Sequence, residues 1–511
     1  MTMINQNAVL YFLDRHAEGA RASHPAFIEI GEGGRQRSYG ALAEDSAHVA
    51  GLLHDLGVQR GERAAMIVLD TIEFPAIFWG ALRAGVVPVP LNTLLAVDYY
   101  EVILNDSRAE VLFVSEPLAA TIAPLRPRLP YLKHVFVIGE AQDGMVAYAS
   151  ALKAAQPRPE AAHASEHDTA FWLYSSGSTG KPKGVMHRHG AIKATTDTFA
   201  AKVLGFSPND VVFSAAKLYF AYGLGNAMTF PMAVGASAAL FAGRPTPDAM
   251  FAGFAEVRPT LFCGVPTLYV ALIAAAKGTR PAGFERLRLC TSAGEALPAE
   301  IGVSWKKLIG TDILDGVGST EMLHIFLANA PGNVVYGTSG VAVPGYELRL
   351  VDEHGADVGI GAVGELLVKG PSVTLGYWNQ PEKTRATFEG DWTRTGDKYE
   401  RAPLDRFIYC GRTDDMFKVS GIWVSPFEVE QALISHPAVL EAAVVAARDE
   451  HGLDKPKAFV VLKGAATPDI GEKLKAHVKE RIGAWKYPRW IEIVPDLPKT
   501  STGKIQRFKL R

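Results

Sequence analysis

The sequence predicts an α/β protein with a large N-terminal domain of mostly parallel sheets with helices, followed by a small α+β C-terminal domain. Short apolar runs typical of buried strands alternate with helical segments, and this order builds parallel sheets with helices on their faces. The character of the chain changes after about Asp397, where a polar turn precedes further short strands and helices. A length of 511 residues exceeds what one hydrophobic core organises, which also favours two or more domains.

The N-terminal domain shows its strand–helix alternation from residue 64 onward. Each expected strand is a short, largely apolar run, and turn or helix signals follow it. The expected strands are 64–69, 86–89, 110–115, 169–173, 210–215, 260–264 and 287–292, and the expected helices are a stretch ending near 83, one near 97–104 and one at 300–309.

A helix start is the clearest signal in the C-terminal domain. Ser425 suits the N-cap, Pro426 the first helical position, and Glu428 would complete a capping box. We expect this helix to end near 435, another at 472–482, and strands at 442–447, 457–462 and 490–494. The polar turn at 413–415 predicts the domain boundary, which divides the chain into 1–413 and 414–511.

Composition argues against several classes of protein. The net charge is −2 with both signs interspersed, so the basic stripe typical of nucleic-acid binding is absent from the sequence. Cys263, Cys290 and Cys410 lie far apart, which disfavours a zinc knuckle or disulfide scaffold and favours a reducing, cytoplasmic compartment. No signal peptide is evident. The uncharged stretch between Lys217 and Arg244 contains glycines, an asparagine and a proline, so we expect short buried elements there rather than a membrane span.

A loop rich in glycine, serine and lysine follows the expected strand 169–173. Glycine lets backbone N–H groups converge, hydroxyls add donors and lysines add positive charge, which together suit a polyphosphate. A flexible linker is the alternative for such a segment. A Walker loop does not fit, because only two residues separate Gly177 from Gly180 and Pro182 follows Lys181. The candidate phosphate-binding residues are Ser175, Ser176, Gly177, Ser178, Thr179 and Lys183.

Further segments accompany this loop: Thr-Ser-Ala-Gly-Glu at 291–295, Asp-Gly-Val-Gly-Ser-Thr-Glu at 315–321, Thr-Gly-Asp at 395–397, Gly-Arg-Thr-Asp-Asp at 411–415 and Thr-Gly-Lys at 502–504. Each alone is compatible with an ordinary strand-end turn. In this order, from about residue 25 to the end, they resemble the adenylate-forming superfamily of acyl-CoA synthetases, adenylation domains and luciferases. The segments 214–225, 318–324 and 418–426 are most similar to benzoate-CoA and 4-hydroxybenzoate-CoA ligases.

The resemblance implies stacked sheets, a mobile C-terminal domain and a two-step reaction that uses ATP, Mg²⁺ and coenzyme A. An aromatic carboxylate is first joined to the α-phosphate, and the thiol of coenzyme A then displaces AMP. Lys504 would bridge the carboxylate and the α-phosphate, because a mobile positive charge offsets the repulsion between two anions. Glu321 and Thr179 would hold Mg²⁺, and Thr179 and Thr320 would contact phosphate.

The resemblance also assigns the remaining nucleotide contacts. Asp397 would accept hydrogen bonds from the ribose hydroxyls, with Arg412 supporting it. Gly294 and Glu295 would lie along the adenine, and Asp315 and Gly316 complete the set.

The second half-reaction depends on the mobile domain. Asp414 matches the family's hinge position, and the domain would rotate to bring Lys418 to the site in place of Lys504. Gly421 would leave room for the pantetheine arm, so a side chain there should block thioester formation more than adenylation.

The acid pocket would include Ala221, Tyr222, Gly223 and His324. A flat ring fits beside small residues, and tyrosine can stack on its edge. A histidine near apolar residues is also compatible with an ordinary core role. Benzoate is the main expectation, and 4-hydroxybenzoate and 2-aminobenzoate remain alternatives. Loading of an aryl acid onto a carrier protein and a non-catalytic binding protein also stay open. We expect a monomer or homodimer with no nucleic-acid or membrane partner.

Overall fold

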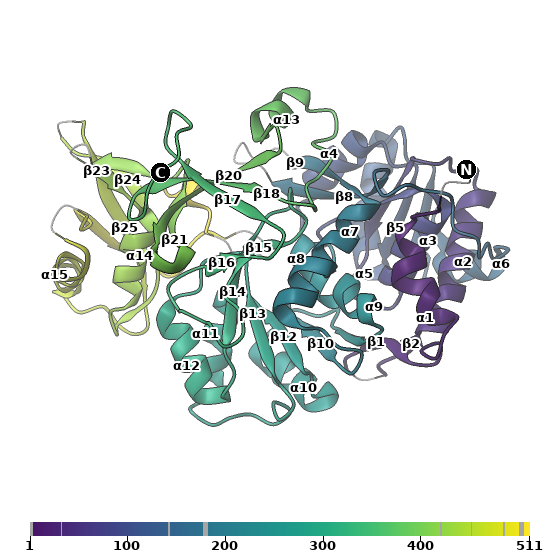
Figure 1. The fold of residues 1–511 in the computed structure, drawn as a ribbon, viewed down its shortest axis with the longest axis horizontal. Helices are drawn as coiled ribbons and strands as arrows, with labels where there is room; N and C mark the ends of the chain where they lie inside the picture. The colour runs from purple at the N-terminus through teal and green to yellow at the C-terminus, as the bar shows by residue number, and fades with distance from the viewer. Residues whose placement is uncertain are drawn as a thin grey trace.

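The computed structural model describes residues 4–31, 33–141, 144–176, 182–419, 422–450, 452–483, 486–499 and 505–511. Its N-terminal part is at the right of Figure 1, and its C-terminal part is at the left. The first elements are η1 (Leu10–Asp14) and α1 (Arg15–Ala17).

A parallel sheet of strands β4–β3–β5–β6–β7 confirms the alternation expected from residue 64 onward. Successive residues of a strand point to opposite faces. Ala64 and Met66 therefore join one core cluster with α2 and α3, whereas Ala65 and Ile67 join another with α4 and α5. The elements are β3 (Arg63–Ile67), β4 (Val87–Pro90), β5 (Val111–Ser115), β6 (His134–Ile138), β7 (Val146–Ala147), α2 (Tyr39–Asp55), α3 (Glu73–Ala84), α4 (Val97–Ser107), α5 (Glu116–Ile122), η2 (Ala123–Arg128) and α6 (Tyr148–Ala154).

A second, larger sheet has the order β16–β15–β14–β13–β12–β10–β11–β1–β2. It is parallel from β1 to β14 and antiparallel at both edges. Its strands are β1 (Pro25–Glu29), β2 (Gln36–Ser38), β10 (Val211–Ser214), β11 (Ser237–Leu240), β12 (Leu261–Gly264), β13 (Leu289–Ser292), β14 (Ile313–Gly318), β15 (Ile325–Ala328) and β16 (Val341–Ala342). The carboxyl ends of β13 and β14 lie side by side, where ligands of open parallel sheets bind.

Some of the helices around this sheet are formed by the uncharged stretch between Lys217 and Arg244. As expected, that stretch forms short buried elements, and no helix in the described ranges is long and apolar enough to cross a membrane. The helices are α7 (His189–Thr195), η3 (Thr196–Leu204), α8 (Ala221–Leu224), η4 (Gly225–Thr229), α9 (Phe230–Val234), α10 (Pro247–Val257), α11 (Pro266–Ala275) and α12 (Ala299–Ile309).

The strand before the candidate phosphate loop is longer than expected. β8 (Thr169–Ser176) pairs with β9 (Pro182–Arg188) and continues three residues beyond the expected end at 173. Ser175 and Ser176 are therefore strand residues, and Ser175 lies opposite Lys183. Pairing with β9 supplies the hydrogen bonds that the polar sequence alone did not indicate.

An antiparallel sheet joins the two ends of the molecule (Figure 1). Its central strand β20 carries the Thr-Gly-Asp segment, and β21 pairs with it. The elements are β17 (Glu347–Val351), β18 (Val363–Lys369), α13 (Pro381–Thr387), β19 (Phe388–Glu389), β20 (Trp392–Ala402), η5 (Pro403–Asp405) and β21 (Arg406–Arg412).

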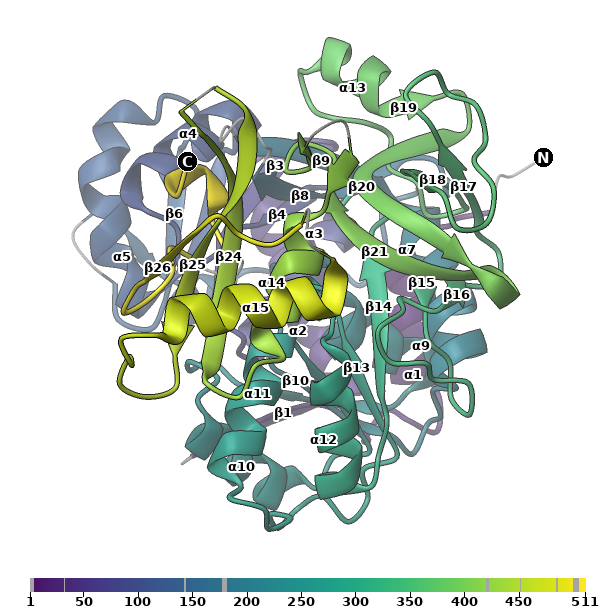
Figure 2. The ribbon, with the colours of Figure 1, turned by 90° about the vertical axis from the view of Figure 1, so that its left-hand side faces the viewer.

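The C-terminal region has its own core between a sheet and two helices, as Figure 2 shows from the side. Ser425 caps α14 as expected, because its Oγ accepts from the Glu428 N–H at 3.1 Å. The prediction that Glu428 completes a capping box is wrong, since its carboxylate binds Lys486 Nζ at 2.6 Å instead. The elements are β22 (Phe417–Val419), β23 (Ile422–Val424), α14 (Pro426–Ile434), β24 (Val439–Arg448), β25 (Asp454–Leu462), α15 (Ile470–Ile482), β26 (Trp490–Ile493) and η6 (Arg507–Lys509).

Candidate active site

A buried ion pair lies where β9 meets the turn after β14. Lys183 Nζ is 2.8 Å from Glu321 Oε1, and the two side chains are only 12% and 14% exposed. The hydroxyl of Tyr377 donates to the same carboxylate oxygen at 2.8 Å and lies 2.9 Å from Lys183 Nζ. Three segments distant in sequence therefore converge on one carboxylate.

This arrangement keeps Glu321 charged although it is buried. Burial alone would raise the pKa of Glu321, but the Lys183 charge and the hydrogen bonds from Lys183 and Tyr377 lower it below its ordinary value. Lys383 on α13 also faces the pair, and burial together with the charge of Lys183 lowers the pKa of Lys383. The site is thus an ionised carboxylate among cationic groups, which suits a ligand with several negative charges.

The donor set fits a magnesium ion that arrives with a nucleotide. Mg²⁺ in such sites takes one or two carboxylates, with phosphates and water completing its octahedron. Within the described ranges no group of three or more His, Cys, Asp or Glu side chains could hold a metal, so a dedicated protein cage is not found there. Glu321 is the carboxylate that would hold the ion.

Asp397 and Arg412 form the expected pair on neighbouring strands. They lie opposite each other on β20 and β21, with Arg412 Nη1 3.0 Å from Asp397 Oδ1 and 2.9 Å from the Thr395 carbonyl oxygen. Burial would lower the pKa of Arg412, but the charge of Asp397 raises it overall. Gly396 has a φ of 71°, and a Cβ there would come within 2.7 Å of the guanidinium. A side chain at position 396 would therefore strain the backbone and push the guanidinium from its present place.

The carboxyl ends of β13 and β14 bring further predicted residues together. Gly294 adopts a φ of 95° just after β13, with Glu295 next to it, and Asp315 lies opposite Ser292. Burial raises the pKa of Asp315 to about 8, and its Oδ1 has no hydrogen-bond partner in the parts of the chain that are described. Burial raises the pKa of the Tyr399 hydroxyl well above its ordinary value, and the charges of Asp397 and Asp315 add to this rise.

The same turn that carries Thr320 and Glu321 leads to His324. His324 is 2% exposed and packs against the rings of Phe230 and Tyr222, with centroids 4.4 and 5.8 Å away. Its Nε2 lies 3.3 Å from the Tyr222 carbonyl oxygen, and its Nδ1 has no partner among the described residues. Burial lowers the pKa of His324 to about 3, so the ring is neutral at pH 7 with Nε2 as donor and Nδ1 as acceptor.

A small cavity of about 10 Å³, close to the size of one water molecule, lies beside His324. Leu323, which also lines it, has a left-handed φ of 63°, a strained conformation for leucine that occurs most often at functional sites. Most of the lining is apolar (Phe171, Ile192, Ala221, Leu224 and Leu323), and Thr195, Thr229 and His324 add polar groups.

Two of the predicted acid-pocket residues hold this region in place. The Tyr222 hydroxyl lies 2.6 Å from Thr291 Oγ1, which joins α8 to β13. Gly223 packs against the Lys217 backbone, where an added Cβ would approach Lys217 O to 2.1 Å. Their contact with a substrate stays a prediction.

Several predicted residues are described only in part. Ser176 ends β8, Gly316 lies in β14, Lys418 lies in β22, and Asp414 follows β21. Gly177, Ser178, Thr179, Gly421 and Lys504 lie outside the described residues.

The sequence alone did not indicate Tyr377, Lys383 or Thr291 as site residues. Tyr377 stands in Gly-Tyr-Trp-Asn, a segment that contains no motif spacing, and it meets Glu321 across 56 residues of chain. A lysine two residues after Pro381 is equally unremarkable in sequence. Only the fold places these groups together.

Comparison with known proteins gives matches over most of the chain. The AMP-binding enzyme family matches residues 13–378, and the family of AMP-binding enzyme C-terminal domains matches residues 428–504. A 4-hydroxybenzoate–CoA/benzoate–CoA ligase of Rhodopseudomonas palustris is 51% identical over 100% of this chain and 95% of its own length. A benzoate–CoA ligase of Thauera aromatica is 54% identical over 89% of this chain and 86% of its own length.

A solved structure is similar along its whole length. The benzoate CoA ligase from Burkholderia xenovorans LB400 has a TM-score of 0.90 and 47% sequence identity, with 100% of both chains covered.

Proposed function

This chain belongs to the AMP-binding enzyme family as an ATP-dependent aryl-CoA ligase, and we propose that its preferred acid is benzoate, which it converts to benzoyl-CoA with release of AMP and pyrophosphate. The observation that supports this most is the turn at 319–324. It carries the ionised Glu321 at one end and His324, beside an apolar cavity, at the other. The phosphate side and the acid side of the reaction would thus lie three residues apart.

In the first half-reaction, a benzoate oxygen attacks the α-phosphorus of ATP and pyrophosphate leaves. Glu321 would hold Mg²⁺, which offsets the charge of the phosphates when bound. Lys183 would keep the Glu321 carboxylate oriented and add positive charge. Lys504 would lie between the carboxylate and the α-phosphate, and Thr179 and Thr320 would donate to phosphate oxygens.

The nucleotide would be held by groups at the strand ends. Asp397 would accept from the ribose hydroxyls while Arg412 fixes the orientation of its carboxylate. Gly294, Glu295, Asp315 and Gly316 would surround the adenine. In this role the buried Asp315 would remain protonated at neutral pH, because its pKa is about 8, and could donate as well as accept.

In the second half-reaction, the thiol of coenzyme A attacks the acyl carbon, AMP leaves with the bonding electrons, and the thiol proton is lost. We propose that rotation at Asp414, between domains 1–413 and 414–511, replaces Lys504 by Lys418 and Gly421 for this step. ATP and coenzyme A are supplied in the cytoplasm, where we propose that the enzyme works in aromatic compound metabolism as a monomer or homodimer.

The mostly apolar residues around His324 support benzoate over its substituted relatives. A polar ring substituent left without a partner in an apolar site costs about 1–3 kcal/mol, which is roughly 10- to 100-fold in preference. His324 Nδ1 is a lining acceptor without a partner in the described parts, so 4-hydroxybenzoate or 2-aminobenzoate is the second candidate if its donor reaches that nitrogen.

A panel of acids tests the proposal. Benzoate, 4-hydroxybenzoate and 2-aminobenzoate are each supplied with ATP and Mg²⁺, and pyrophosphate release and thioester formation are measured separately. We expect the highest kcat/KM with benzoate, and no pyrophosphate above background with Lys504→Ala. A preference for either substituted acid would reject benzoate as the main substrate. Adenylate formation without consumption of coenzyme A would favour transfer to a carrier protein.

A further inference from the structure

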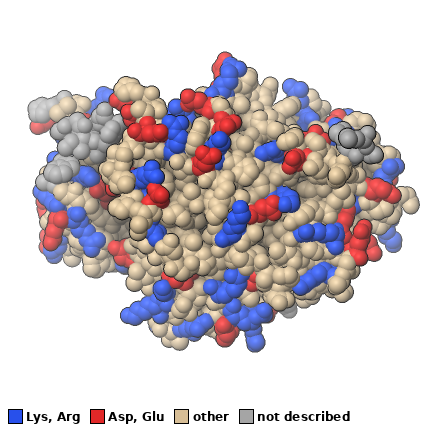
Figure 3. Space-filling view, in the orientation of Figure 1, with Lys and Arg blue, Asp and Glu red and all other residues tan. Residues whose placement is uncertain are grey.

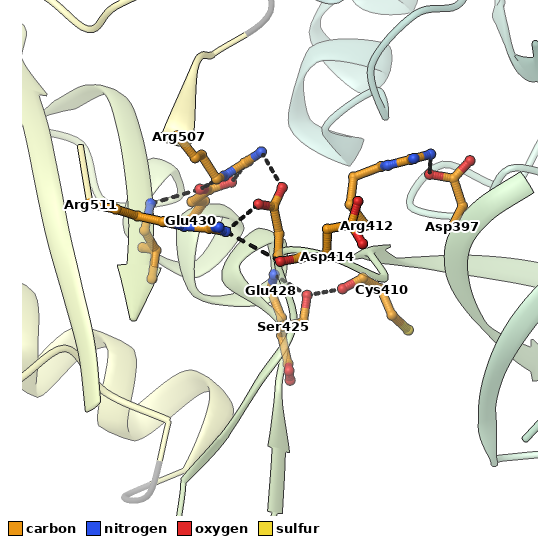
Figure 4. Close-up of polar contacts among 11 residues, drawn as sticks. Asp397, Cys410, Arg412, Asp414, Ser425, Glu428, Glu430, Arg507 and Arg511 are labelled. Atoms are coloured by element: carbon orange, nitrogen blue, oxygen red, sulfur yellow. Dashed lines mark hydrogen bonds and ion pairs between the residues drawn. The ribbon is translucent and has the colours of Figure 1, made fainter. Parts of the chain in front are cut away.

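The end of the chain is held by a buried ion pair that the proposed reaction does not use. Arg507 Nη2 is 2.7 Å from Glu430 Oε2, and Arg507 Nε is 3.0 Å from Glu430 Oε1 (Figure 4). The Glu430 side chain is 4% exposed and also accepts from the Val444 N–H at 2.7 Å. Such a two-pronged pair fixes both position and orientation, which a single contact does not.

The same arginine reaches the residues next to the proposed hinge. Arg507 Nη1 lies 3.5 Å from Asp415 Oδ2, and the last residue, Arg511, lies 2.5 Å from Asp415 Oδ1 and 3.4 Å from the Asp414 carbonyl oxygen. Figure 4 shows Arg507 and Arg511 on one side of Asp414 and the Arg412–Asp397 pair on the other. The tail is therefore fastened to the first residues after β21.

The chain on the other side of the hinge is fastened to the N-terminal domain. Arg412 pairs with Asp397, and the Thr413 N–H donates to the Gly396 carbonyl oxygen at 2.8 Å. The change from one set to the other falls between Thr413 and Asp414, and the hydrogen bond from Ser425 Oγ at the N-cap of α14 to the Cys410 carbonyl oxygen crosses this point. A rotation there would carry the tail, α14 and Asp415 together without breaking the contacts of Arg507.

The described residues on either side of Lys504 contact each other and β24. Lys499 forms an antiparallel bridge with Ile505, and its Nζ lies 2.7 Å from Glu441 Oε2 on β24. Arg507 follows Lys504 by three residues, so at most about 11 Å of extended chain separates them.

We propose that Arg507 is a positioning residue for adenylation, because it holds the chain three residues after Lys504 against α14 and the hinge side of the C-terminal domain. This inference rests on the proposed role of Lys504. Without the Arg507 guanidinium, Lys504 would keep its charge. A smaller fraction of the enzyme molecules would have that charge placed beside the reacting anions at any moment. The second half-reaction, in which Lys504 has no assigned role, should not depend on Arg507.

The experiment separates the two half-reactions in Arg507→Met and Arg507→Lys. Methionine keeps apolar volume without charge, and lysine restores the charge without the two-pronged geometry. Pyrophosphate release from benzoate and Mg-ATP reports adenylation, and synthetic benzoyl-AMP with coenzyme A reports thioester formation. Arg349→Met is the matched control, because Arg349 pairs with Asp357 at 2.8 Å on the exposed surface of β17.

We expect Arg507→Met to lower kcat for adenylation by about 10-fold or more, with KM for ATP and benzoate and the rate of thioester formation changed less than about threefold. Arg507→Lys should recover part of the loss, and Arg349→Met should behave as the unmodified enzyme. An equal loss in both half-reactions, or no loss in Arg507→Met, would overturn the inference. Full adenylation by Lys504→Ala would instead reject the proposed role of Lys504, on which this inference rests.

A second variant keeps the test decisive if Arg507→Met does not fold. Asp415→Asn leaves the Arg507–Glu430 pair in place and weakens only the link to the hinge. We expect it to slow adenylation selectively, by about threefold. Unchanged adenylation in Asp415→Asn would then overturn the proposed link between the tail and the hinge.

Discussion

Lys183 Nζ and Glu321 Oε1 lie 2.8 Å apart although 138 residues separate them in the chain. The ammonium supplies the charge that keeps this carboxylate ionised in a buried position. A metal-bound nucleotide would meet a site whose negative and positive groups are already oriented, so little reorganisation is needed when it binds.

Replacement of Tyr377 by phenylalanine should weaken this site without removing its charges. The variant loses the hydroxyl that donates to Glu321 at 2.8 Å. We expect kcat/KM for adenylation to fall about 10-fold, because a hydrogen bond to a charged group contributes about 1.5 kcal/mol. The pKa of Glu321 should rise, so the acidic limb of the rate profile moves to higher pH. Tyr131→Phe, at a 44% exposed position, is the control, and a profile that shifts equally in both variants would contradict the assignment.

Asp397→Asn should weaken nucleotide binding more than it slows the chemical step. An amide presents one accepting oxygen in place of two and loses the charge that holds Arg412. We expect KM for ATP to rise about 10-fold with kcat changed much less. Initial rates at varied ATP measure this, with Asp357→Asn as a control at an exposed ion pair. A fall in kcat alone would place Asp397 elsewhere in the reaction.

Gly225→Ala should disturb the acid pocket through His324. A Cβ at position 225 would lie 2.4 Å from His324 Cδ2 and 2.5 Å from its Nε2, so the ring must move. Overpacking of this kind costs about 1–3 kcal/mol, and we expect KM for benzoate to rise about 10-fold while KM for ATP stays within twofold. Gly471→Ala, in α15 with open space around it, is the matched control. Unchanged benzoate kinetics in Gly225→Ala would separate His324 from acid binding.

We expect His187 to make the free energy of unfolding depend on pH. It is fully buried beside Phe171, neither ring nitrogen has a partner in the described parts, and burial lowers its pKa to about 3 from 6.5. As pH falls below 6.5 the unfolded chain binds this proton and the folded chain does not, so stability is lost progressively down to about pH 3. Between pH 7 and 5 the loss is about 2 kcal/mol.

His187→Leu removes that loss and should be close to neutral in stability at pH 7, because the removed nitrogens had no partners. Denaturant unfolding at pH 7 and pH 5 measures the difference. The exposed His354→Leu controls for loss of an imidazole in general. Equal pH dependence of His187→Leu and the unmodified protein would contradict the assigned pKa.

The sequence predicts the strands and helices better than it predicts the site. Buried strands such as β5 and β12 consist of consecutive apolar residues, and that signal is local. The extension of β8 to Ser176 depends on pairing with β9, and the Glu428 side chain pairs with Lys486, 58 residues away, in place of its own helix end. Such partners are set by tertiary contacts that no local pattern contains.

The candidate site shows the same division. Lys183, Glu321, Asp397 and Arg412 stand in recognisable motifs. The structure brings Asp397 and Arg412 into the expected pair, whereas the pairing of Lys183 with Glu321 was not predicted. Tyr377 does not stand in a recognisable motif, because a hydroxyl that donates to a carboxylate far away in the chain needs no particular sequence neighbours. The acid is harder still to predict, since it depends on the shape of a cavity to which several separate segments contribute.

At Leu323 the stability of the backbone and the shape of the cavity favour different residues. Its left-handed backbone costs about 1–2 kcal/mol relative to an ordinary conformation, and glycine would avoid most of that cost. Glycine, however, would leave the wall of the cavity without its side chain. The fold therefore keeps a strained backbone conformation two residues after Glu321, at some cost to the stability of this turn.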